Sequence, residues 1–77
     1  MPTVLRINGY RFFFYSVDCS EPPHIHVERG NVLAKFWINP IAIADAGRFR
    51  ERQLNEIRRI IEDYHTELLA AWAEHCG

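Results

Sequence analysis

Two pairs of alternating segments, each pair joined by a short turn, constrain this chain more than any other feature. The runs TVLRI and YRFFFYSV flank an Asn-Gly pair at positions 8–9. Alternation with a period of two is typical of a strand, and Asn-Gly suits the two positive-φ positions of a type I′ turn. The sequence therefore predicts a β-hairpin that places Arg6 opposite Arg11 and Val4 opposite Phe13.

A second hairpin is predicted after the prolines at positions 22–23. Proline cannot donate a ladder hydrogen bond, so the next strand begins after it. The runs HIHVER and VLAKFWI flank a Gly-Asn pair at positions 30–31, and a turn there places His26 opposite Lys35. A further proline ends the second run. Segment 41–49 fits either a short edge strand or a loop.

The period of the apolar residues changes from two to between three and four at about Arg50. This pattern predicts an amphipathic helix that continues to about His75 and is roughly 38 Å long. That length exceeds what a four-stranded sheet needs, so the helix kinks, overhangs the sheet or packs against a second molecule. The residues before it offer no oxygen for an N-cap, which leaves its exact start open. The stripe consists of Leu54, Ile57, Ile61, Tyr64, Leu68 and Trp72.

These elements predict a single α+β domain over residues 1–77. We expect a four-stranded antiparallel sheet of two hairpins, followed by a long C-terminal amphipathic helix packed on one face. Strand alternation assigns an apolar set to the face under the helix: Leu5, Ile7, Tyr10, Phe12, Phe14, Ile25, Val27, Ala34, Phe36 and Ile38. The opposite face, called the outer face below, receives Val4, Arg6, Arg11, Phe13, Tyr15, His24, His26, Glu28, Leu33, Lys35 and Trp37.

Composition narrows the classes of function only a little. The chain is 48% hydrophobic, which favours folding over disorder. Its net charge of −1 gives no overall reason to expect nucleic-acid binding. Cys19 and Cys76 lie far apart in sequence and make no disulfide scaffold, so we expect free thiols. With no cationic leader and no apolar run of about 20 residues, the expected location is the cytoplasm, with no membrane partner.

His24 and His26 share one face of a strand, with side chains roughly 7 Å apart. One interpretation is a zinc site completed by Cys19 and by His75 or Cys76, but this spacing matches no familiar zinc pattern. We therefore predict no metal and no cofactor. A second interpretation is docking of a partner protein. A third is local hydrogen bonding that stiffens the strand entry.

A fourth interpretation is catalysis, with His24 and His26 transferring protons on a ribose hydroxyl and its leaving oxygen. The candidate substrate-binding residues lie on the same face. Cationic side chains would take the phosphate, and aromatic ones would contact a base or a partner. They are Arg6, Arg11, Tyr15, Lys35 and Trp37.

Four blocks of the sequence resemble a family of small prokaryotic proteins catalogued as domain of unknown function four-one-six-zero. The blocks are TVLRINGYRFFFYS, EPPHIHVERG, AKFWINP and ELLAAWAEHCG, which together span nearly the whole chain. The resemblance implies the toxin-side member of a two-gene toxin–antitoxin module, with a small partner protein. It supplies no catalytic residues. The family often places a serine near the helix start, where this chain has Arg50.

Two functions are expected from these observations. The first is a toxin-like component that acts as a metal-free ribonuclease or RNA-binding protein through the outer face, with an antitoxin-like partner protein. The alternative is a non-catalytic interaction subunit whose outer face docks on a partner, or a homodimer formed through the helix or the sheet face. Whether the chain is an enzyme stays open at this point.

Overall fold

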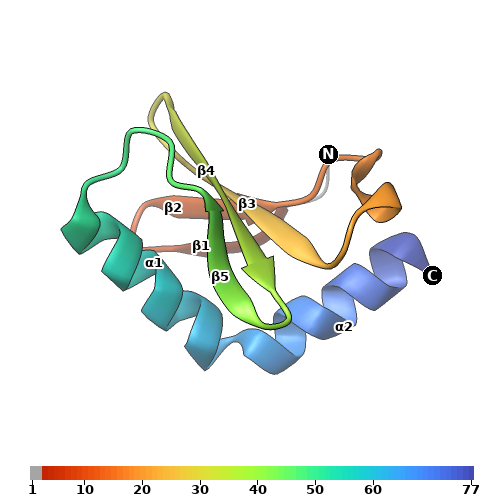
Figure 1. Cartoon of the computed structure of the whole chain (residues 1–77). Coiled ribbons are helices and arrows are strands. Elements are labelled where there is room, and N and C mark those ends of the chain that lie inside the picture. Colours follow the sequence, from red (N-terminus) through yellow and green to blue (C-terminus); the bar gives the residue numbers. More distant parts are fainter. Residues whose placement is uncertain (1–2) are drawn as a thin grey trace.

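The computed structural model describes residues 3–77 and has the predicted α+β architecture, a sheet with helices on one side (Figure 1). Its strands are β1 (Thr3–Ile7), β2 (Tyr10–Phe13), β3 (His24–Arg29), β4 (Val32–Ile38) and β5 (Ile41–Asp45). A single 3₁₀ turn, η1 (Asp18–Ser20), lies between β2 and β3, and the helices are α1 (Glu51–Asp63) and α2 (His65–Cys76).

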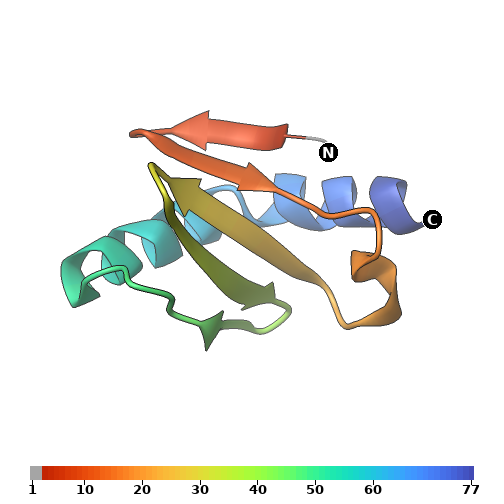
Figure 2. The same ribbon diagram turned by 90° about the horizontal axis from the view of Figure 1, so that it is seen from above.

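The sheet has five strands rather than the predicted four. All neighbours are antiparallel, in the order β1-β2-β3-β4-β5, so the chain meanders from one edge to the other (Figure 2). The fifth strand comes from segment 41–49, for which the sequence allowed either a strand or a loop. A tight turn at positions 39–40 folds this segment back so that Ile41 pairs with Ile38. Isoleucine and alanine alternate in this segment, but both are apolar, so the pattern does not distinguish a strand from a loop.

The registers of both hairpins follow the prediction, with one correction in β1. Arg6 pairs with Arg11, and His26 pairs with Lys35. An irregularity near the start of β1 then places Thr3, and not Val4, opposite Phe13. The outer-face assignment of Val4 was therefore wrong, since the extra residue turns its side chain toward the core.

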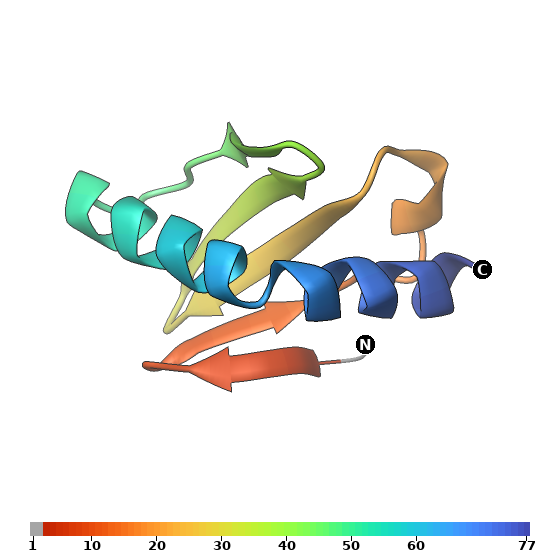
Figure 3. The ribbon, with the colours of Figure 1, turned by 90° about the horizontal axis from the view of Figure 1, so that it is seen from below.

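The single predicted helix is two helices that meet at Tyr64, and both cover the same face of the sheet (Figure 3). The backbone of Tyr64 (φ −110°, ψ 23°) leaves the helical region and redirects the chain. The imidazole of His65 bonds the carbonyl of Ile38 at this bend, which fixes α2 to the end of β4. A kink was one of the three outcomes that the length of the stripe allowed, and it keeps Leu68 buried.

Helix α1 begins at Glu51 with a partial cap. The backbone N–H of Arg50 donates to the side chain of Gln53 at 2.9 Å, which is one half of a capping box. The guanidinium of Arg50 has only donors and cannot supply the other half. This arrangement resolves the helix start without the missing serine.

The core lies between the sheet and the two helices and uses the residues that strand alternation assigned to that face. Eight of the ten are buried, and Leu5 and Ile7 on the edge strand are partly buried. On the outer face, Phe13 is only 1% exposed, which corrects the expectation of a wet aromatic there. Arg11 and Tyr15 cover its ring.

The expectation of free thiols was wrong, because Cys19 in η1 and Cys76 at the end of α2 form a disulfide, with their Cα atoms 5.4 Å apart. The two residues are distant in sequence, and only the fold of the helices back over the sheet brings them together. Neither α1 nor α2 has the length and apolar character that a membrane crossing requires.

Candidate functional site

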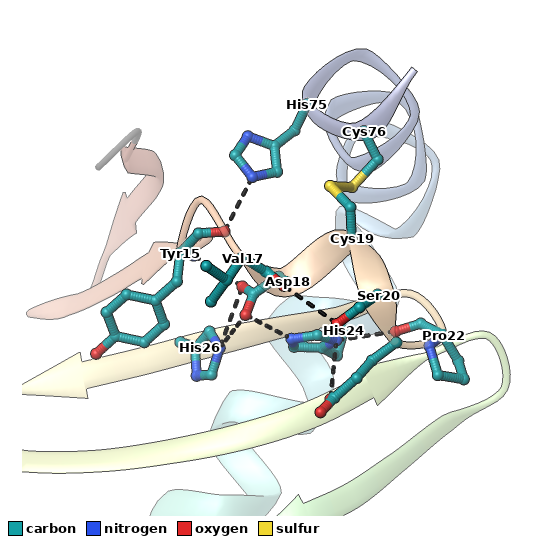
Figure 4. The surroundings of a disulfide bond; sticks show 11 residues. Tyr15, Val17, Asp18, Cys19, Ser20, Pro22, His24, His26, His75 and Cys76 are labelled. Carbon is teal, nitrogen blue, oxygen red and sulfur yellow. Dashed lines mark hydrogen bonds and ion pairs between the residues drawn. A yellow bond between two sulfur atoms is a disulfide. The ribbon is translucent and has the colours of Figure 1, made fainter.

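Three side chains with acid–base chemistry meet where η1 passes the start of β3: Asp18, His24 and His26 (Figure 4). The histidines project from one face of β3, as their spacing in the sequence predicted. Asp18 approaches them from the connection between β2 and β3. We call these three residues the Asp-His-His cluster.

Local backbone contacts place the carboxylate of Asp18. Its Oδ2 accepts the backbone N–H of Tyr15 at 2.7 Å, and its own N–H donates to the Tyr15 carbonyl at 3.2 Å. The neighbouring disulfide ties η1 to α2, and His75 bonds the same Tyr15 carbonyl at 3.0 Å. The carboxylate is therefore 8% exposed and fixed in direction.

The ring of His24 is buried, with 1% of its side chain exposed. Its Nδ1 lies 2.8 Å from the carbonyl of Pro22, and its Nε2 lies 3.1 Å from Oδ1 of Asp18. The second approach is close but does not have hydrogen-bond geometry, so Nε2 has no hydrogen-bond partner among the described residues. The indole rings of Trp37 and Trp72 pack around it, with centroids at 5.7 and 5.1 Å.

The ring of His26 is more accessible, with 12% of its side chain exposed. Its Nε2 lies 3.2 and 3.3 Å from the two carboxylate oxygens of Asp18. Tyr15 meets the ring edge-to-face at a centroid distance of 4.6 Å. Of the two predicted catalytic histidines, only His26 is placed to meet a molecule that arrives from outside.

Burial and hydrogen bonding set the charges of the cluster. Burial, with a smaller contribution from the nearby His24 and Lys35, lowers the pKa of His26 despite the opposing effect of the Asp18 carboxylate, so the free imidazole is neutral at pH 7. Burial acts to raise the pKa of Asp18, but the Tyr15 amide and the two imidazoles outweigh it and lower that pKa. The cluster therefore presents a carboxylate beside the neutral imidazole of His26.

Three of the five predicted binding residues surround the cluster. Tyr15 lies against His26, and Lys35 is its cross-strand partner. The ammonium of Lys35 is 4.7 Å from the centroid of Trp37 and forms an ion pair with Glu21. Lys35 and Trp37 lie beside the histidines because β4 pairs with β3, and Tyr15 lies there because it follows the end of β2, the other neighbour of β3.

The two arginines lie farther out. Arg11 is on β2, where it forms an ion pair with Glu28 at 3.3 Å and stacks on Phe13. Arg6 is exposed on the edge strand β1, two strands away from His26. The structure thus assembles Tyr15, Lys35 and Trp37 around the histidines but does not bring Arg6 to them.

A hollow of about 160 Å³ opens beside His26 on the outer face. It is lined by Tyr15, His26, Leu33, Ala34, Lys35 and Asp45. A larger cavity of about 400 Å³ lies between β1 and α2, and its lining contains none of the predicted site residues. Of the two cavities, only the smaller hollow is therefore lined by predicted site residues, namely Tyr15, His26 and Lys35.

Sequence reasoning missed Asp18, which organises both histidines. Its position in a polar connection resembled that of any solvated loop acid, and no spacing rule links it to β3. The zinc interpretation completed the site with Cys19 and with His75 or Cys76 instead, but the two sulfurs are joined to each other and cannot serve as thiolate ligands. The donor atoms of the Asp-His-His cluster, in contrast, lie within 4.8 Å of one another.

Comparison with known proteins gives a family but no function. No curated protein and no solved structure shows a significant match. The family model described as "Domain of unknown function (DUF4160)" matches residues 9–73, which include the Asp-His-His cluster, the hollow, and most of both helices. Because this match covers most of the sequence, the chain belongs to the DUF4160 family.

Proposed function

We propose that the chain is the toxin-like member of a two-protein toxin–antitoxin pair, and that its small partner protein binds the outer face of the sheet. The toxin-like role rests on what the family resemblance implies. The choice of surface follows from the fold, because α1 and α2 cover the opposite face (Figure 3). The observation that supports docking most directly is the hollow beside His26.

The size of the hollow favours a protein side chain over a small-molecule ligand. Sites for small molecules usually enclose about 300–1,000 Å³, and this hollow has about 160 Å³. Protein interfaces often place one anchor side chain in a small pocket near their centre. Leu33, which is 42% exposed, and the ring of Tyr15 supply apolar walls for such an anchor.

The charges around the hollow also favour a protein over a nucleic acid. Arg11 is paired with Glu28 and Lys35 with Glu21, so two of the cations on this face already have carboxylate partners. A phosphate backbone would have to compete with those carboxylates. A protein with charges of both signs can match such a rim without breaking the pairs.

RNA cleavage at the same surface is a second candidate, favoured by one observation. His26 is a neutral imidazole that bonds a buried carboxylate and lines the hollow next to Lys35. If Nε2 donates to Asp18, Nδ1 keeps its lone pair and can act as a general base. In this second candidate function, the buried His24 holds Asp18 in place beside His26 and does not contact the substrate.

Two exposed residues on opposite faces offer a matched test of docking. Leu33 on the outer face and Ile43 on the helix side are 42% and 41% exposed. The experiment is titration calorimetry with the purified product of the adjacent gene. We expect Leu33→Asp to weaken binding at least about 10-fold, which corresponds to about 1.4 kcal/mol, and Ile43→Asp to leave it unchanged.

Growth after induced expression tests the toxin-like role. We expect arrest that is relieved by co-expression of the partner, with relief lost in Leu33→Asp and kept in Ile43→Asp. An equal effect of both variants on binding, or no complex with the adjacent product, would contradict the docking proposal. Cleavage of RNA by the isolated protein, abolished by His26→Gln, would support the second candidate instead.

A further inference from the structure

The hydrogen bonds of His24 leave one of its ring nitrogens in an unusual position. A carbonyl oxygen only accepts, so Nδ1 of His24 must carry the proton that it shares with Pro22. In the neutral ring, Nε2 then carries a lone pair, and it faces Oδ1 of Asp18 at 3.1 Å. Both residues are buried, with His24 1% and Asp18 7% exposed, so the two electron pairs repel each other unless a cation lies between them.

His26 and Asp18 provide further electron pairs for the same cation. The three donor groups are within 4.8 Å of one another, and Nε2 of His26 lies 3.2 Å from Oδ2. Two ligands that are each about 2.1 Å from one ion stand roughly 3.0–3.4 Å apart in octahedral or tetrahedral geometry. The separations from the carboxylate to both imidazoles lie in that range.

The surroundings of His24 also match those of a metal-binding histidine. Such residues usually donate their other ring N–H to a carbonyl or a carboxylate, which fixes the tautomer and aims the lone pair at the metal. Pro22 supplies that carbonyl. Packing between Trp37 and Trp72 holds the ring in place.

We propose that the Asp-His-His cluster binds a divalent first-row transition metal such as Zn²⁺. Two imidazoles and one carboxylate are donors that such ions favour over Ca²⁺ or Mg²⁺. Three protein ligands leave at least one coordination position for water, as in catalytic rather than structural sites. The inference is independent of partner binding, and it requires His26 to coordinate through Nε2, with its remaining proton on Nδ1.

The chief alternative is that the cation between His24 and Asp18 is only a proton. His24 would then be a buried imidazolium paired with the carboxylate, and no metal would be needed. The metal and the proton exclude each other at His24, because a protonated Nε2 cannot coordinate a metal ion. Nitrogen chemical shifts of the histidine rings distinguish them.

The test uses protein with its disulfide intact, so that free thiolates do not bind the ion, after removal of metal by a chelator. We expect one equivalent of Zn²⁺ to bind and to raise the thermal midpoint, since the unfolded chain lacks the site. Titration with Co²⁺ should quench tryptophan fluorescence, because both tryptophans pack against His24. Asp18→Asn and His26→Gln should weaken binding by more than about 100-fold.

His65→Gln is the matched control, because His65 also bonds a backbone carbonyl but lies outside the cluster. Its Zn²⁺ affinity should equal that of the wild type. Equal affinity in all three variants, or no binding of Zn²⁺ or Co²⁺ to the wild type, would overturn the proposal. If the cluster variants unfold, nitrogen shifts of the wild type decide: Zn²⁺ must shift Nε2 of His24 and His26, and a Nε2 of His24 that stays protonated in excess Zn²⁺ overturns it.

Discussion

At the scale of single residues, Asp18 organises the cluster through its carboxylate. Its two carboxylate oxygens meet a backbone amide and two imidazoles, all in a site with little access to water. Removing this carboxylate leaves the amide of Tyr15 and the imidazole of His26 without that partner, and each buried unsatisfied group costs about 1–3 kcal/mol. The same arrangement makes the stability of the metal-free protein sensitive to pH.

We expect acid to destabilise the metal-free protein in two stages. The pKa of His26 is lowered from 6.5 on folding, so its contribution is present above that pH and is lost as pH falls through the folded value. The pKa of Asp18 is lowered from 3.8, so its contribution is lost only at more acid pH. The free energy of unfolding can be measured by urea titration with chelator present, between about pH 7 and 5. It should fall less steeply with decreasing pH in His26→Gln than in the wild type, and an equal pH dependence would contradict this.

At the scale of elements, the turn before α1 is held tightly against β4. Gly47 has a φ of +61°, and a Cβ added there would lie 1.9 Å from the carbonyl oxygen of Leu33. Gly30, in the turn between β3 and β4, has the same φ but open space around it. The two glycines therefore separate backbone strain from steric contact.

Alanine at these two positions should give very different results. Gly30→Ala should cost about 1 kcal/mol, because only the left-handed backbone conformation is strained. Gly47→Ala should cost more than about 3 kcal/mol, because a backbone atom must also move. The free energy of unfolding in urea measures both, and similar costs at the two positions would show that the 41–49 segment adjusts freely.

These elements also show what the sequence could and could not predict. Turn residues and alternation predicted the registers of both hairpins except at the start of β1, because those signals are local and the irregularity there is not. Strand β5 and the bend at Tyr64 depend on contacts with β4 that no local pattern encodes. The histidines were found from their spacing, whereas Asp18 was missed because its direction depends on η1 and on a covalent tie to α2.

At the scale of the whole molecule, the disulfide joins residues that are 57 positions apart. Closing a loop of this length reduces the entropy of the unfolded chain and should stabilise the fold by about 4 kcal/mol. We expect a reductant to lower the free energy of unfolding by about that amount, and the Cys19→Ser, Cys76→Ser double variant to be insensitive to it. A change below about 1 kcal/mol in the wild type would mean that the reduced chain is already restrained.

The same bond makes most of the chain a closed ring, which changes what a protease can do to it. The turn at positions 30–31 is exposed and lies inside that ring. A cut there would open the ring but would not release a fragment, because the disulfide would still join the two polypeptides. The two pieces would separate only after reduction, so a nicked molecule would keep both halves of the sheet within reach of each other.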